Sequence, residues 1–402
     1  MIQIAKGTSR DIRVANRFEL LRYIIAGATV SRQRAAQETG LSVATVSNLV
    51  GELLESRLLK EVGFEDSRGG RPRGLVSVDP SGGILIGVDV AETYVRVELF
   101  DAHLSGLAAV EEPLRPEENR PDQVVGHVVS GVRAGLARVG VPQDRVLGVG
   151  VSVPGQVDRD GGVSVFAPNW DWHDVPLRGL LAEQLSLPLY LDNPLRAAVV
   201  AELWFGAGRG RDNVAVLNLG TGTGAGLAFA GSLYRGATNS AGEWGHTTLV
   251  MDGRPCRCGS RGCVETYVGA PGIMQHLRDL DPSSPMLRAG DQTATIDALA
   301  CGFEAGDPVA VKVIAETARY LAVAIANVIN LVNPEVVVLS SWVATRLGEP
   351  LLAEVRPILG QYALSRPLAA TEIAVSSLGG DPVVLGAATF ALEGFLAAIG
   401  RP

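Results

Sequence analysis

One histidine and three cysteines lie close together in this 402-residue chain, between residues 243 and 265: His246, Cys256, Cys258 and Cys263. Zinc favours tetrahedral nitrogen and sulfur ligation, and four protein ligands leave no position for water, so this set is typical of a closed structural site. Gly259 and Gly262 allow the tight backbone turns that thiolates so close in sequence need in order to converge. The sequence therefore predicts one structural zinc ion per chain.

The few cysteines also bear on the compartment. A disulfide-bearing surface loop is the alternative, but three clustered cysteines leave one unpaired, and nothing else in the sequence indicates an oxidising compartment. The fourth cysteine, Cys301, lies in an apolar, helical stretch, where we expect a buried thiol. Residues 1–22 carry charges throughout and lack the apolar core of a signal peptide, and no window is long and uncharged enough for a membrane span. We expect a cytoplasmic protein of two or three domains.

Charge is distributed unevenly along the chain. Residues 1–78 hold twelve Lys and Arg against eight Asp and Glu, an excess of four positive charges, whereas the whole chain has a net charge of −8. The overall acidity argues against a nonspecific polyanion binder, but a locally basic module is what contact with DNA phosphates requires. The sequence therefore predicts a basic head, residues 1–78, on an acidic body.

The head has the pattern of a winged helix-turn-helix. Apolar residues at helical spacing predict a first helix around residues 18–25. Ser31 is expected to cap a second helix that ends at Thr39, and Ser42 a third helix over residues 43–55. Short polar side chains near the start of the third helix are expected to meet base edges and phosphates: Ser42, Thr45, Ser47 and Asn48. The alternative is a three-helix bundle with a solvated polar face.

A wing is expected after the third helix. Residues 58–62 have the pattern of a strand, and a glycine-rich arm then carries three arginines: Arg68, Arg71 and Arg73. Arginines on a slim Gly/Pro backbone fit a narrow minor groove, where the negative potential is strongest over A·T tracts. A flexible basic linker is the alternative for the arm taken alone, and a neighbouring helix-turn-helix favours DNA contact.

From residue 83 onward strands and helices alternate, which indicates an α/β body large enough for two lobes. Strands are expected over residues 84–89, 94–100, 146–153, 187–191, 214–219 and 336–339, and helices over 122–139 and 311–331. No tandem repeat of short period and no low-complexity tract interrupts this pattern.

The body resembles the ROK family of sugar kinases and transcriptional regulators over nearly its full length. The most specific match combines Glu-Trp-Gly-His at 243–246 with Cys-x-Cys-x4-Cys-x-Glu at 256–265. Weaker matches are the glycine-containing segments 153–158 and 219–226, Asn169 with Trp172, and Asn-Pro-Glu at 333–335. The resemblance implies an actin-like (ribonuclease H-like) body with lobes over 79–195 and 196–402, and allows the last helix to return to the first lobe.

The resemblance also implies a sugar site. In this family two carboxylates and a histidine hold sugar hydroxyls while the other nitrogen of the histidine holds zinc, which implies sugar contacts at Glu243, His246 and Glu265, and further contacts at Gly155, Asn169 and Asn193. A carboxylate can accept hydrogen bonds from two vicinal hydroxyls, and a metal-bound imidazole has a fixed orientation. Support of the zinc ligands alone is the alternative for Glu243 and Glu265.

Two departures from the kinase pattern argue against phosphoryl transfer. Counting back from Glu202 aligns Pro194 with the aspartate that serves as the base in the family's kinases, and proline cannot accept a proton. Asp192 is displaced by two residues, roughly 6–7 Å along a strand, which is too far for a proton transfer that needs hydrogen-bond contact. The first phosphate loop of the family has glycine where this chain has Ala91, so a methyl group faces the expected nucleotide.

The resemblance and the departures predict a sugar-responsive transcriptional regulator, a repressor of carbohydrate-utilisation genes whose effector binds in a catalytically inactive kinase cleft. A homodimer or homotetramer is expected, because two heads match two operator half-sites. A sugar kinase with an appended DNA-binding head, using Asp192 as its base, is one alternative. A corepressor-type module that binds DNA and a second protein but no sugar is another, and retention of Glu243, His246 and Glu265 speaks against it.

Overall fold

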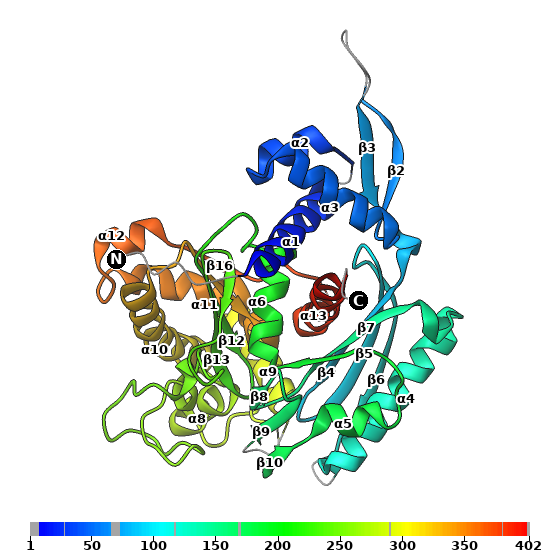
Figure 1. Ribbon diagram of the computed structural model, residues 1–402. Helices are drawn as coiled ribbons and strands as arrows, with labels where there is room; N and C mark the ends of the chain where they lie inside the picture. Colours follow the sequence, from blue (N-terminus) through cyan, green and yellow to red (C-terminus); the bar gives the residue numbers. More distant parts are fainter. Residues whose placement is uncertain are drawn as a thin grey trace. The chain divides into compact units, whose positions relative to one another are not determined.

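A computed structural model describes residues 8–27, 29–65, 73–115, 118–167, 170–288, 291–379 and 381–399. The chain divides into two compact units. The first unit comprises Met1–Ala197 together with Val383–Pro402, and the second comprises Ala198–Pro382 (Figure 1). Within the described residues, no helix combines the length and apolar character needed to cross a membrane.

The first unit begins with the winged helix-turn-helix that the sequence predicts. Its elements are α1 (Ser9–Gly27), β1 (Val30–Ser31), α2 (Arg32–Thr39), α3 (Val43–Glu55), β2 (Leu59–Phe64) and β3 (Gly74–Val78). The three short strands form one sheet in the order β1-β3-β2, so β2 and β3 are the wing (Figure 1). Leu20, Ile24, Val46, Leu49 and Leu53 are fully buried or nearly so, and they pack the three helices together.

The two predicted helix caps have different outcomes. Ser42 caps α3 as expected, because its hydroxyl accepts a hydrogen bond from the amide of Thr45 at 3.0 Å. Ser31 precedes α2 but its side chain makes no capping hydrogen bond, so that prediction was wrong in its chemistry. The Ser31 hydroxyl instead donates to Glu65 at 3.1 Å, which links β1 to the wing.

The rest of the first unit is built on a five-stranded sheet in the order β11-β7-β4-β5-β6. Its strands are β4 (Ile84–Val90), β5 (Tyr94–Asp101), β6 (Gly106–Pro113), β7 (Val146–Ser152) and β11 (Leu189–Asp192). A smaller sheet, β10-β9-β8, holds β8 (Gln156–Asp158), β9 (Val163–Ala167) and β10 (Trp172–Val175). Short connections and helices complete it: η1 (Pro80–Gly82), α4 (Pro121–Val139), η3 (Gln143–Arg145) and α5 (Leu177–Ala182). All seven residues of β4 are buried, as expected for a strand covered on both faces.

Helix α13 (Pro382–Ala398) brings the far end of the chain back onto this sheet. Two glycines on neighbouring strands make the close approach possible. A Cβ at Gly87 would lie 2.1 Å from the carbonyl oxygen of Val384, and one at Gly150 would lie 1.7 Å from that of Ala387. Any side chain at either position would therefore push α13 off the sheet.

The second unit contains the other five-stranded sheet, in the order β14-β13-β12-β15-β16. Its strands are β12 (Val214–Leu219), β13 (Thr223–Phe229), β14 (Ser232–Tyr234), β15 (Val336–Ser340) and β16 (Glu372–Val375). Its helices are η4 (Trp244–His246), α7 (Glu265–Val268), α8 (Ala270–Leu280), α9 (Gln292–Glu304), α10 (Pro308–Val332), α11 (Ser341–Leu359) and α12 (Ser365–Ala370). Helix α6 (Pro194–Phe205) begins in the first unit and continues into the second.

Candidate functional site

The exposed start of α3 is the candidate DNA-reading surface. Ser47 and Asn48 are exposed on it, on the face opposite the buried Val46 and Leu49. Ser42 and Thr45 hydrogen-bond to each other at 2.8 Å between their hydroxyl oxygens, so they shape the helix terminus. The structure therefore brings the four predicted DNA contacts of this helix onto one accessible surface.

The basic arm is only partly described. Arg68 and Arg71 lie outside the described residues. Arg73 stands at the start of β3 and is 56 % exposed, and its Nη1 lies 3.7 Å from Oε2 of Glu65. At that exposure and distance the ion pair is weak, so it leaves Arg73 able to exchange Glu65 for a phosphate.

The predicted metal ligands converge to the spacing of a tetrahedral site. The four candidate ligand atoms, from His246, Cys256, Cys258 and Cys263, all lie within 4.8 Å of one another. The sulfurs of Cys258 and Cys263 are 3.7 Å apart, and Nδ1 of His246 is 3.7 Å from the sulfur of Cys256. Zinc–sulfur bonds of about 2.3 Å at tetrahedral angles would separate two sulfurs by about 3.8 Å. The residues therefore fit a metal ion of the size and geometry of zinc.

The protonation of the thiols also bears on metal binding. Burial, together with the neighbouring thiols of Cys256 and Cys258, raises the pKa of Cys263 to about 12. Burial raises the pKa of Cys256 as well. Several thiolates cannot share this space without a cation to balance them, and a divalent metal ion supplies that charge.

Glycine is required in the loop that carries these ligands, as the sequence predicts. Gly262 has φ +72°, and a Cβ on it would lie 1.7 Å from the carbonyl oxygen of Val250. Gly259 also has a positive φ, +89°. The two left-handed residues let the loop turn back between Cys256 and Cys263, so the cluster depends on them.

Glu265 lies beside the metal cluster, at the start of α7, and is 7 % exposed. Its Oε2 accepts a hydrogen bond from the amide of Thr223 at 2.9 Å. Arg257 donates to both of its oxygens, from Nε at 3.0 Å and from Nη2 at 3.4 Å. The sequence did not single out Arg257 as a partner of Glu265, although its position between two metal ligands places it close to that carboxylate.

Glu243 and His246 reach the same place from another segment. Glu243 directly precedes η4 and His246 is its last residue, and the amide of His246 donates to the carbonyl oxygen of Glu243 at 3.1 Å. Between them, a Cβ at Gly245 would lie 2.1 Å from the carbonyl oxygen of Thr223, so η4 packs directly on the start of β13. Thr223 therefore contacts both the η4 segment and Glu265. Sugar binding by Glu243, His246 and Glu265 stays a prediction.

The expected sugar contacts of the first unit are also neighbours. Asn193 donates from Nδ2 to the carbonyl oxygen of Gly155 at 3.4 Å, and its Oδ1 accepts from the amide of Arg196 at 3.1 Å. Gly155 has φ +85°, and a Cβ on it would lie 2.1 Å from the carbonyl oxygen of Phe166. Asn169 lies outside the described residues. Sugar binding by Gly155, Asn169 and Asn193 remains a prediction.

Pro194, which the sequence pattern is expected to align with the base of the family's kinases, is the first residue of α6. The adjacent carboxylate, Asp192, is buried and forms an ion pair with Arg196, whose Nη1 lies 3.1 Å from Oδ1. The same oxygen accepts the amide of Asn193 at 2.9 Å. Both residues of the pair are almost fully buried, so Asp192, the last residue of β11, has a charged partner in the first turn of α6.

The segment expected to hold a phosphate loop is a tight connection between β4 and β5. The amide of Ala91 donates to the carbonyl oxygen of Tyr94 at 2.9 Å, which closes the turn. Asp89 is 5 % exposed, and the hydroxyl of Tyr94 donates to its Oδ2 at 3.1 Å. This turn is therefore closed by internal hydrogen bonds.

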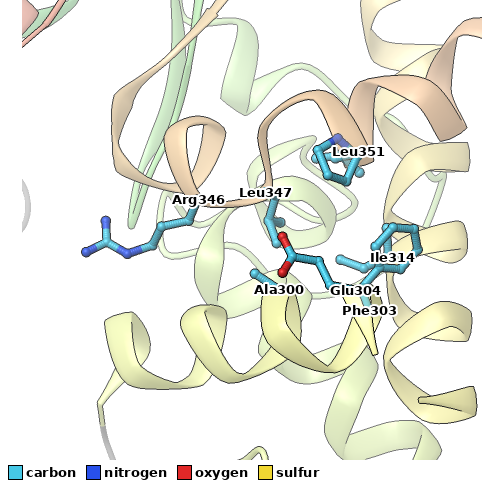
Figure 2. A pocket seen from close by; sticks show the side chains of 8 residues that line it. Ala300, Phe303, Glu304, Ile314, Arg346, Leu347 and Leu351 are labelled. Carbon is cyan, nitrogen blue, oxygen red and sulfur yellow. The ribbon is translucent and has the colours of Figure 1, made fainter. Parts of the chain in front are cut away.

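Two cavities lie within the second unit. The smaller, between α9, α10 and α11, has a volume of about 10 Å³, which is room for about one water molecule; Glu304 and Leu347 line it (Figure 2). The larger has a volume of about 580 Å³, within the range of small-molecule sites. Its charged lining residues are balanced, two arginines and two acids: Arg254, Arg257, Glu265 and Asp279. Of the three sugar contacts expected on this unit, Glu265 alone lines it.

The prediction of a buried Cys301 was wrong. The residue does lie on a helix, α9, but its side chain is exposed. Ile296 and Leu299 fill the buried face of α9, and Cys301, two residues beyond Leu299, lies off that face.

A winged helix-turn-helix joined to a two-unit α/β body with a Cys/His cluster defines a class of DNA-binding proteins that share their body with sugar kinases. The chain belongs to the ROK family, whose sequence model matches residues 85–393. It is 28 % identical to the xylose repressor of Caldicellulosiruptor bescii over 97 % of this chain and 98 % of that protein.

Two further comparisons differ in how much of this chain they cover. A glucokinase of Thermotoga maritima is 32 % identical over 97 % of its own length but matches 77 % of this chain. A crystal structure of a ROK family transcriptional regulator, a homologue of the E. coli MLC protein, superimposes with a TM-score of 0.79 at 24 % identity, covering 96 % of this chain and 98 % of that one. The similarity in fold therefore extends over nearly the whole chain, the head included.

Proposed function

We propose that this chain is a sugar-responsive transcriptional repressor of carbohydrate-utilisation genes. The observation that carries the proposal is the extent of the similarity: the match to a xylose repressor runs through the head and the body, whereas the match to a glucokinase covers 77 % of the chain. The winged helix-turn-helix, with Ser47 and Asn48 exposed on α3, supports operator binding. A repressor of this kind acts on DNA in the cytoplasm.

The effector in this proposal is a neutral sugar held by Glu243, His246 and Glu265, with further contacts from Gly155, Asn169 and Asn193. The balanced charges of the 580 Å³ cavity beside Glu265 support a neutral ligand over a phosphorylated one, because each arginine there already has a carboxylate partner. The name of the Caldicellulosiruptor bescii relative makes xylose the first sugar to test.

Zinc is the metal we propose for the Cys/His cluster. Three cysteines and one histidine suit zinc among the common metal ions, and four protein ligands make a structural site. Nδ1 of His246 faces the sulfurs. A metal there fixes the imidazole and leaves Nε2 as its only ring nitrogen for a hydrogen bond to the sugar.

Catalysis is absent from this proposal. Pro194 has no proton acceptor, and Asp192, the carboxylate that the kinase alternative requires, is paired with Arg196. Ala91 places a methyl group where the family's phosphate loop has glycine. These three features favour a regulator over a sugar kinase with an appended DNA-binding head.

In this proposal, the sugar regulates operator binding by shifting the populations of two conformations of the protein. A sugar that binds one conformation better than the other must change the affinity for operator DNA, and operator DNA must change the sugar affinity by the same factor. We propose a homodimer or homotetramer whose two heads bind two half-sites, so that a change in head spacing weakens operator binding.

Calorimetry with xylose, glucose and their phosphates, with and without operator DNA, tests the proposal. We expect a neutral sugar to bind, and to bind at least about tenfold more weakly in the presence of operator, a difference of about 1.4 kcal/mol. Glu243→Ala should remove the effect of sugar on operator affinity without changing operator affinity in its absence. Equal sugar affinity with and without operator would contradict the proposal.

A further inference from the structure

Arg17 lies on α1 and is buried in the head. It is 3 % exposed. Its Nε donates to Oε2 of Glu52 at 3.1 Å, and its Nη2 contacts the same oxygen. Glu52 lies on α3, the helix that carries the candidate DNA-reading side chains. A buried guanidinium thus fixes the position of α3 relative to α1.

The same guanidinium reaches a residue near the other end of the sequence. Nη1 of Arg17 donates to the carbonyl oxygen of Leu396, in the last turn of α13. The last four carbonyls of a helix have no partner within the helix, and a cation there also interacts favourably with the helix dipole. The buried guanidinium of Arg17 is therefore hydrogen-bonded on both sides. It pairs with the negative charge of Glu52, and it donates to a carbonyl oxygen in the last turn of α13.

Among the described residues, hydrogen bonds connect the head to the rest of the first unit at two separated places. One is the covalent junction, where the amide of Asp79 donates to the carbonyl oxygen of Leu58 at 2.9 Å and Arg145 donates to that of Ser81. The other is the contact of Arg17 with Leu396. A single junction would leave the head free to pivot about it, whereas a second attachment at a distance fixes its direction.

Helix α13 begins where the chain returns from the second unit to the first, between Pro382 and Val383. In its first turns, a Cβ on Gly386 would lie 1.8 Å from the carbonyl oxygen of Ala197, the residue at which the chain leaves the first unit. Asn193, an expected sugar contact, lies four residues before Ala197, whose amide donates to its carbonyl oxygen at 3.2 Å. Helix α13 thus connects the neighbourhood of Asn193, near its start, with Arg17, near its end.

We propose that Arg17 is a positioning residue through which α13 sets the orientation of the DNA-reading helix α3, so that its loss uncouples operator binding from the sugar. The inference rests on the proposed function for the identity of the effector. It adds the contact, between Arg17 and α13, through which sugar binding to the body changes operator binding by the head.

The test uses the full-length protein and two variants, with operator affinity measured by fluorescence anisotropy at one salt concentration, with and without xylose. Arg17→Ala should lower operator affinity by at least about fivefold without sugar, and should reduce the effect of sugar on operator affinity to less than about twofold. Sugar affinity without DNA should stay within about twofold of the wild-type value. Arg17→Lys should behave similarly, because one ammonium group cannot hold Glu52 and Leu396 in the same forked geometry.

Arg13→Ala is the matched control. Arg13 also pairs with Glu52 but is 57 % exposed, and the contact with Leu396 belongs to Arg17. This variant should keep the effect of sugar on operator affinity. If Arg17→Ala and Arg17→Lys retain the sugar effect, or if Arg13→Ala loses it equally, Arg17 is not the positioning residue.

Amide hydrogen exchange of the wild-type protein gives a second measurement that does not depend on a variant folding. Operator binding should slow exchange of the amides of residues 396–399 by at least about threefold, because fixing α3 also fixes Arg17 and the end of α13. Unchanged exchange there would overturn the inference. Operator binding that no sugar alters would instead contradict the proposed function, and the exchange result would then decide the role of Arg17.

Discussion

The guanidinium of Arg257 holds the carboxylate of Glu265, with Nε 3.0 Å from Oε1 and Nη2 3.4 Å from Oε2. The amide of Thr223 donates to Oε2 as well. An ionised carboxylate has about four acceptor positions, so these three donors leave about one for a sugar hydroxyl. A sugar that places two vicinal hydroxyls on Glu265 must therefore displace Arg257.

The energy of this pair can be measured through stability. Arg257→Ala leaves a nearly buried carboxylate without its cation, and we expect it to lower the free energy of unfolding by about 1–2 kcal/mol, since Arg257 itself is partly exposed. Adding Glu265→Gln should restore at least half of the loss, because a neutral amide does not need the cation. Urea unfolding gives these values, with Arg261→Ala, an exposed arginine of the same loop, as the control. Additive effects of Arg257→Ala and Glu265→Gln would mean that the two side chains do not interact.

Metal content tests the zinc proposal. Elemental analysis should find about one zinc ion per chain, and Cys258→Ser should lose the metal, because three remaining ligands cannot complete the tetrahedral set. Sugar affinity should fall with it, since the loop also carries Arg257 and leads into Glu265. Cys301→Ser, which changes an exposed cysteine on α9, should keep the metal. Full sugar affinity in the metal-free protein would show that sugar binding does not depend on the metal cluster.

Phosphoryl transfer should be undetectable. Purified protein with ATP, magnesium and xylose or glucose is expected to form no sugar phosphate above the level of a protein-free control, because Pro194 replaces the base and Arg196 holds Asp192. Turnover that disappears in Asp192→Ala would show that the kinase alternative is correct.

We expect α3 and the arm to make different contributions to DNA binding. Asn48→Ala is expected to change base preference at particular operator positions, whereas Arg73→Ala should weaken binding to all sequences and reduce the salt dependence of binding. Anisotropy titrations against single-base operator variants at several salt concentrations distinguish the two effects. Unchanged salt dependence in Arg73→Ala would show that Arg73 makes no contact with DNA phosphates.

Glu202 should contribute a pH-dependent part of the stability. Burial raises the pKa of this carboxyl, which accepts hydrogen bonds from Ser376 at 2.5 Å and from the amide of Ala207 at 2.9 Å. Because the folded pKa lies above the unfolded value of 4.5, its contribution is present below pH 4.5 and is lost as the pH rises through the folded pKa. Glu202→Gln, which cannot ionise, should therefore gain stability relative to the wild type as the pH rises through this window. A constant difference between the two proteins from pH 4 to pH 8 would contradict the assignment.

Local signals made much of the structure predictable. Val43–Glu55 was expected as a helix with the bounds that α3 has, because Ser42 and the apolar spacing act within one or two turns. The convergence of Cys256, Cys258 and Cys263 was predictable for the same reason, since the ligands lie within eight residues and glycine permits the turn.

Contacts between distant segments could not be predicted from the sequence. Ser31 has the chemistry of a cap, yet Glu65, 34 residues further along the chain and directly after β2, accepts its hydrogen bond. Arg17 looks like any polar residue of an amphipathic helix until Leu396 and Glu52 surround it. The spacing of Asp192 and Arg196 suits an ion pair, but only the fold shows that the pair is buried.

The return of α13 to the first sheet has a consequence for synthesis of the protein. Gly87 and Gly150 pack against α13, which the ribosome makes more than 230 residues after them. Arg17 likewise lacks its partner until Leu396 has been made. At about 5–20 residues per second, the strands that carry Gly87 and Gly150 exist for more than about ten seconds before α13 is made. The second unit is complete by then, so the two units finish folding in the reverse of the order in which they begin. Nascent chains that stop before residue 382 should consequently expose an apolar sheet face to chaperones, and would present a head that lacks its second attachment.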